Sequence, residues 1–113
     1  NGKDERPVGE ICANGTLIDV DGKTVKGCNP AKVKRTILRD VWATLEIDIK
    51  DGDIRQYING EEIIHFTNPR YDANHAMGKT FIKGDNAVLS EGYISLQSNS
   101  HPIEFRKIDI LEY

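Results

Sequence analysis

Apolar and polar residues alternate along most of this chain, most clearly over residues 41–50. One face of an extended strand there would carry alanine, leucine and isoleucine. The other face would carry tryptophan, threonine and acidic residues. A period of two predicts a strand with one buried face. The chain then turns at residues 51–53, returns over 54–58, turns at Asn59-Gly60 and continues over 62–67. Asp-Gly and Asn-Gly favour two-residue hairpin turns, so this stretch predicts a three-stranded antiparallel meander.

The front of the chain shows the same pattern with shorter runs. Residues 8–13 predict a strand, Asn14-Gly15 a tight turn, 16–20 a returning strand, Asp21-Gly22 a second turn and 23–25 a short third strand. Residues 68–86 form a long polar connection, of a length that is usually functional or disordered. No segment has a sustained period of 3.6 residues, so we expect an all-β fold built on antiparallel sheet.

The last quarter, residues 91–113, predicts two strands joined by a short polar turn. Ile103 and Phe105 are two residues apart and would share one face of a strand. Ile108 is also apolar, but it lies an odd number of residues from both and would point to the other face. One regular strand cannot place both sets on the same face, so we predict a bulge near residues 106–107. Bulges often lie beside sites, which directs attention to the polar face of this hairpin.

Residues of this hairpin also carry a family resemblance. The run Gly-Tyr-Ile-Ser-Leu-Gln (92–97), a polar turn with histidine and Pro-Ile-Glu-Phe-Arg-Lys-Ile-Asp-Ile (102–110) resemble the closing hairpin of the 3-keto-disaccharide hydrolase-like domain family. The similarity continues upstream at Val41-Trp42 and in residues 57–60. Lys107 departs from the asparagine that is usual in the family. The turn at residues 99–101 also differs from the more common His-Gly ending.

The resemblance implies a concanavalin A-like jelly roll, an antiparallel β-sandwich, and links the chain to carbohydrate hydrolysis in exported bacterial proteins. It covers roughly the second half of such a domain. We therefore expect residues 1–113 to be a single β-sandwich domain, either the C-terminal part of a longer family domain or a reduced form of it. Sheet edges exposed by a reduced sandwich would favour pairing between copies, and thus a homo-oligomer.

Composition narrows the range of partners. The net charge is −3 with no basic block, which argues against a nucleic-acid partner. No apolar run approaches the roughly 20 residues that span a bilayer. The chain starts at Asn1 without a methionine or a signal peptide, so we interpret it as processed or trimmed. Cys12 and Cys28 could form a disulfide in an exported protein or stay free thiols in the cytosol, and spacing leaves both open.

Candidate site residues follow from the polar face and from the resemblance. As proton carriers we name Glu10, in an early strand, and His101, in the final turn. For sugar binding we name Gln97 and Arg106, which offer donors and acceptors suited to hydroxyl groups, together with the ring-bearing side chains of His65, Tyr93 and Trp42.

Each candidate also has an ordinary structural interpretation. Glu10 could lie on a solvated face, Arg106 could pair with Glu104, and Trp42 could cover the sheet with its indole N–H bonded to backbone. His65 could be a plain strand residue. The aspartates near Gly52 depart from the order of a calcium loop, and a hairpin turn accounts for them. We therefore predict no metal site and no cofactor.

The sequence thus favours a hydrolase or lyase acting on glycosides, with 3-keto glycosides implied by the resemblance. An elimination of that kind does not need the carboxylate pair of an ordinary glycosidase. The alternatives are a non-catalytic carbohydrate-binding module of a larger exported protein and a purely structural sandwich, because one fold can serve all three.

Overall fold

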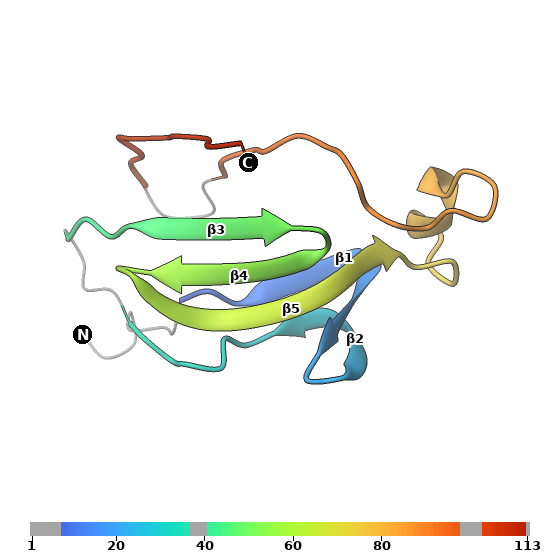
Figure 1. Ribbon diagram of the computed structural model, residues 1–113, viewed down its shortest axis with the longest axis horizontal. Helices are drawn as coiled ribbons and strands as arrows, with labels where there is room; N and C mark the ends of the chain where they lie inside the picture. Colours follow the sequence, from blue (N-terminus) through green and yellow to red (C-terminus); the bar gives the residue numbers. More distant parts are fainter. Residues whose placement is uncertain (1–7, 37–40, 98–102, 113) are drawn as a thin grey trace.

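One antiparallel sheet of five strands organises the protein. The computed structural model describes residues 8–36, 41–97 and 103–112. The strands are β1 (Ile11–Val20), β2 (Lys23–Asn29), β3 (Leu45–Lys50), β4 (Asp53–Ile58) and β5 (Glu61–Tyr71), in the spatial order β2-β1-β5-β4-β3 (Figure 1). The only helix in the described ranges is a short 3₁₀ turn, η2 (Gly78–Phe81). The all-β prediction is confirmed. The described residues form one sheet, so the second sheet of a sandwich is not among them.

Three of the predicted hairpin turns are present. At Asp21-Gly22, Asp51-Gly52 and Asn59-Gly60 both central residues have positive φ, between 50° and 84°. Type I′ turns require this backbone conformation, and Asn, Asp and Gly adopt it at least cost. The β3–β4–β5 meander therefore forms as the alternation and the turn residues predicted.

The fourth predicted turn, Asn14-Gly15, is wrong. The chain continues through it as one strand, β1, and the register against β2 shifts between Ala13 and Ile18. Gly15 has φ +78°, but here the left-handed residue lies within a bulge and does not reverse the chain. Strand β5 likewise extends to Tyr71, into residues predicted as connection.

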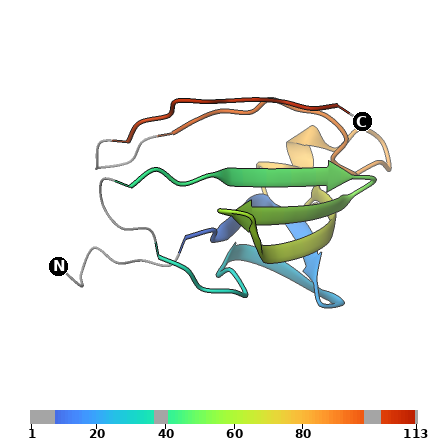
Figure 2. The same cartoon turned by 60° about the vertical axis from the view of Figure 1, so that its left-hand side comes forward.

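The predicted closing hairpin is also not formed as strands. Residues 91–97 and 103–112 are extended but belong to no strand, which removes the basis for a bulge at 106–107, and the turn at 98–102 lies outside the described residues. Figures 1 and 2 both show these two segments on the β3 side of the sheet. A segment becomes a strand only where a neighbouring backbone supplies its hydrogen bonds, so alternation alone did not decide the pairing.

The core lies on the apolar face of β1, β4 and β5. Its buried members are mostly isoleucines: Ile18, Ala31, Ile54, Ile58, Ile63, Ile64 and Phe66. The segment after β2 is tied to this core, because the backbone N–H groups of Lys32 and Val33 both donate to the carbonyl of Ile63. Gly9 leaves room for Ile63, since a Cβ on Gly9 would lie 2.0 Å from Ile63 Cδ1.

Strand β3 extends the same apolar face but is not covered by the described residues. Ile49 pairs with Ile54, Ile47 with Gln56 and Leu45 with Ile58, which places the β3 side chains on the core side. All three are nevertheless more than half exposed. Among the described strands β3 is also the edge strand of the sheet, the position at which a further strand can add.

Cys12 and Cys28 form a disulfide across β1 and β2, which decides between the two states that the sequence left open. The two residues face each other directly in the ladder and close a loop with a sequence separation of 16.

We expect the Cys12→Ser/Cys28→Ser variant to lose about 3 kcal/mol of unfolding free energy, because the unfolded chain gains loop entropy. Urea denaturation measures this loss. Wild-type protein in a reducing agent is the matched control and should show the same midpoint as the variant. An unchanged midpoint in both would contradict the prediction.

Candidate functional site

The face of the sheet opposite the core is polar across all five strands. The register aligns Thr24, Asp19, Thr67, Asp53 and Lys50 in one row from β2 to β3. Direct cross-strand partners project to the same side of a sheet, so these side chains share one face. Arg55 and His65 are cross-strand partners in the next row, and Tyr57 and Glu62 are cross-strand partners in the row after that. We call this surface the polar face.

At the centre of the polar face His65 and Asp53 form a close pair. His65 Nε2 lies 2.5 Å from Asp53 Oδ1, and both side chains are about 40% exposed. The hydrogen bond from His65 lowers the pKa of Asp53 below its ordinary value of 3.8, opposed in part by desolvation. The Asp53 carboxylate is therefore ionised at neutral pH and can only accept, so Nε2 must carry the proton. In the neutral imidazole this leaves Nδ1 as an unprotonated nitrogen that can take up a proton.

Arg55 connects this pair to a second carboxylate. Its Nη1 donates to Glu62 Oε1 at 2.8 Å, and its Nε lies 3.3 Å from Asp53 Oδ2. The hydrogen bond to Glu62 raises the pKa of the Arg55 guanidinium, so this side chain keeps its charge. Asp53, Arg55, Glu62 and His65 thus form a connected group, the Asp53–His65 cluster. It can hold an imidazole in one orientation and present a fixed cation beside it.

A second network lies on the β1 and β2 side of the same face. Asp19 accepts hydrogen bonds from Thr24, Asn68 and Arg70, and the bonds from Thr24 and Asn68 are the main reasons its pKa is lowered. Arg70 Nη2 also donates to Thr24. Thr67 lies between Asp19 and Asp53 in the sheet. The polar face therefore carries two hydrogen-bonded groups that flank one threonine.

Of the predicted site residues, His65 is the one in the polar face, and its neighbours were not predicted. The signal that could have found them is the adjacent pair Ile63-Ile64, which breaks the alternation of β5. The register of the β4–β5 pair shifts at this place, between Gln56 and Tyr57 on β4. The extra residue is what brings His65 opposite Arg55 and diagonal to Asp53.

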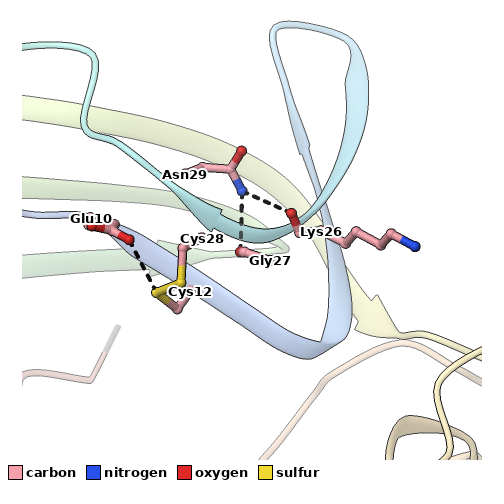
Figure 3. The surroundings of a disulfide bond; sticks show 6 residues. All are labelled: Glu10, Cys12, Lys26, Gly27, Cys28 and Asn29. Atoms are coloured by element: carbon pink, nitrogen blue, oxygen red, sulfur yellow. Dashed lines mark hydrogen bonds between the residues drawn. A yellow bond between two sulfur atoms is a disulfide. The ribbon is translucent and has the colours of Figure 1, made fainter.

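Two other predicted residues, both outside the five strands, contact each other. The guanidinium carbon of Arg106 lies 4.2 Å from the ring centroid of Trp42, a cation–π contact, so the predicted alternative of a pair with Glu104 is not the one the structure shows. Gln97 and Tyr93 are exposed in the segment 91–97. The predicted catalytic residues lie elsewhere: Glu10 is exposed beside the disulfide, with its Oε1 3.6 Å from Cys12 Sγ (Figure 3), and His101 lies outside the described residues.

Two hollows lie away from both groups. One of about 280 Å³ borders the β1 bulge and is lined in part by Asn14, Lys26 and His75. His75 Nδ1 accepts hydrogen bonds from the backbone N–H groups of Met77 and Gly78, which fixes its ring at the turn before η2. The other hollow, of about 100 Å³, lies beside the stacked rings of Tyr71 and Phe81.

The fold and the polar face define the class first: a disulfide-bonded, all-β domain whose exposed sheet face holds an ordered His–Asp pair. The chain belongs to the family described as the 3-keto-alpha-glucoside-1,2-lyase-like domain, whose model matches residues 1–111. The resemblance carried by the last quarter therefore extends over nearly the whole chain. Comparisons with the curated proteins and with the solved structures give no match. In the described residues no helix has the length and apolar character to cross a membrane.

The lowered pKa of Asp53 predicts a pH-dependent contribution to stability. A depressed folded-state pKa adds stability that is fully present above the unfolded value of 3.8 and is lost as pH falls through the folded-state pKa. We expect Asp53→Asn to be less stable than wild type at neutral pH, and the difference to shrink below pH 3.8. Urea midpoints over a pH series measure this. Thr80→Ala, in η2, removes no ionisable group and is the control, so it should differ from wild type by an amount independent of pH. A constant difference for Asp53→Asn as well would refute the assignment.

Proposed function

We propose that this domain acts on glycosides oxidised at C3 and cleaves them by elimination. The observation that carries the proposal is the ordered His65–Asp53 pair on an open polar face in a chain of this family. A ketone at C3 acidifies the C–H bond at C2, so a positioned base of moderate strength suffices to remove that proton. The reaction needs one positioned base, and the cluster contains a single histidine.

In the proposed reaction His65 Nδ1 removes the proton from C2. The electron pair of that bond forms the C1=C2 double bond as the C1–O bond breaks, and the aglycone leaves as an alcohol once protonated. Water then adds across the double bond, with its oxygen at C1 and a proton returned to C2. The net change is a 3-keto glycoside plus water giving a 3-keto sugar plus an alcohol. Asp53 holds the ring through Nε2 and stabilises the imidazolium that forms.

Arg55 and the predicted sugar-binding residues enter as binding groups. Arg55 offers a fixed cation beside His65, where it would stabilise charge that develops on the C3 oxygen. Trp42 offers an aromatic ring to a sugar face, and Arg106, Gln97 and Tyr93 would add contacts from the C-terminal segment. Glu10 and His101 stay predictions as alternative proton carriers, and the same assay tests them through Glu10→Gln and His101→Ala.

The jelly-roll sandwich belongs to the same proposal. Leu45, Ile47 and Ile49 lie on the core side of β3 and are exposed, as expected of a sheet face that a second sheet covers. The disulfide favours an oxidising compartment, and we therefore propose export to the periplasm, the cell surface or the medium. An uncovered edge at β3 could also pair with a second copy.

The test is release of a chromogenic alcohol from a 3-keto glucoside, with the corresponding unoxidised glucoside as the matched control. We expect release from the 3-keto compound alone, because only the ketone acidifies C2. Release from both would indicate an ordinary glycosidase. Binding without release would favour a carbohydrate-binding module, and absence of binding to a glycan panel would favour a structural role. Each of these three outcomes overturns the proposed elimination.

A further inference from the structure

The disulfide and Glu10 form a compact group at the start of the β1–β2 pair. Cys12 and Cys28 are direct partners in the ladder, and Glu10 lies two residues before Cys12 with its carboxylate turned toward the sulfur (Figure 3). One ligand-type atom from each of the three residues lies within 4.8 Å of the other two, and all three residues are exposed. The elimination proposed above uses neither sulfur atom.

The distance from the Glu10 carboxylate to the Cys12 sulfur matches one ligand edge of a tetrahedral metal site. With Zn–S near 2.3 Å and Zn–O near 2.0 Å, two tetrahedral ligands are about 3.5 Å apart for an S/O pair and about 3.8 Å apart for an S/S pair. The observed distance from Glu10 Oε1 to Cys12 Sγ is 3.6 Å. When the disulfide is reduced, the two sulfurs are no longer held at bonding distance, and rotation about the Cα–Cβ bonds of these directly opposed residues lets them reach the S/S edge length.

We propose that the reduced protein binds a thiophilic divalent cation, of the Zn²⁺ type, through Cys12 Sγ, Cys28 Sγ and a Glu10 carboxylate oxygen. Water would fill the fourth position, since the group is exposed. Two thiolates and one carboxylate carry three negative charges, which suits a soft-to-borderline dication better than Mg²⁺ or Ca²⁺. The cation would join β1 to β2 at the place where the disulfide joins them in the oxidised state.

The two states are exclusive, because a sulfur in a disulfide has no thiolate to offer. Reduction adds two electrons and two protons to the S–S bond. In the experiment a trialkylphosphine supplies the electrons and, with one water, becomes the phosphine oxide. Binding then releases the two thiol protons, so the affinity should fall as pH is lowered. The disulfide thus controls whether the site exists.

The probe is Co²⁺, whose thiolate charge-transfer and tetrahedral ligand-field bands report the ligand set directly. We expect phosphine-reduced protein to bind one Co²⁺ with both bands, Zn²⁺ to displace it, and oxidised protein to show neither band. Far-UV circular dichroism follows the fold in parallel, and metal should raise the urea midpoint of the reduced protein. A reduced protein that shows no thiolate band, whether it is folded or unfolded, overturns the proposal.

Variants distinguish metal binding through these three residues from non-specific metal binding. Substitution of groups outside the first ligand sphere of a metal typically costs about 10–100-fold in affinity. Cys28→Ser and Glu10→Gln remove a ligand and should each weaken Co²⁺ binding by at least that factor. His65→Ala is the matched control and should bind Co²⁺ as wild type does, which keeps this test separate from the catalytic proposal. Equal affinity in Cys28→Ser and wild type would refute the site.

Discussion

Replacing His65 with alanine should slow aglycone release from a 3-keto glucoside by about 10²–10⁴-fold, the range expected for loss of a general base. The reason is the geometry of the Asp53–His65 cluster. Asp53 accepts from Nε2 at 2.5 Å and stays ionised, which leaves Nδ1 as the available base. Steady-state rates at neutral pH measure the effect. The loss should fall mainly on kcat, because the proton moves only in the transition state.

Two further variants separate proton transfer from positioning. His65→Gln keeps a side chain that can donate to Asp53 but has no basic nitrogen, so it should be as inactive as His65→Ala. His75→Ala makes the same change at another described histidine, one that binds backbone N–H groups at the turn before η2. It should retain wild-type kcat if it folds, which thermal denaturation checks. An active His65→Gln enzyme would show that the imidazole does not carry the proton.

Replacing Ile63 with alanine should lower the free energy of unfolding by about 2–5 kcal/mol. Ile63 is 1% exposed, the most completely buried large side chain of the core. It is the extra residue of the β4–β5 bulge, and its carbonyl accepts from Lys32 and Val33. Truncation leaves a cavity in the place where the segment after β2 is fixed, and the backbone cannot collapse into it without losing these bonds. Urea denaturation at neutral pH measures the loss. A cost below about 1 kcal/mol would contradict this description of the core.

Ile47→Ala is the matched control for that experiment. Ile47 is the same residue type on the core side of the sheet, but it is 51% exposed on β3. In the described structure its truncation should change the unfolding free energy by no more than about 0.5 kcal/mol. A cost comparable with that of Ile63→Ala would mean that a second layer covers β3. That result would support the sandwich proposal and leave the prediction for Ile63 unaffected.

The sequence was most informative where local chemistry dictates local structure. Asp-Gly and Asn-Gly tolerate positive φ at both turn positions, so three hairpin turns could be placed by inspection. The alternation around β3 and β4 identified the meander because strict alternation of apolar and polar residues over a short run indicates a β-strand. Family membership also followed from ordered short motifs, and these do not depend on knowing which strands pair.

The pairing of residues that are distant in the sequence was harder to predict from the sequence. Asn14-Gly15 has the composition of a turn but lies in a bulge, since β1 gains more by staying paired with both β2 and β5 than by reversing. The last quarter alternates well and yet forms no strand in the described ranges. Periodicity tells which side chains share a face, but a strand exists only if a neighbouring backbone supplies the hydrogen bonds.

What the sequence determined by itself is therefore the all-β class, three of the four predicted hairpin turns and the family, because each depends on residues close together in the chain. Tertiary structure alone decided that Cys12 meets Cys28 with Glu10 beside them, and that His65 meets Asp53 and Arg55. The physical reason is register. One extra residue in a strand moves the side chains that follow it to the opposite face of the sheet. The position of that extra residue depends on packing across the whole sheet.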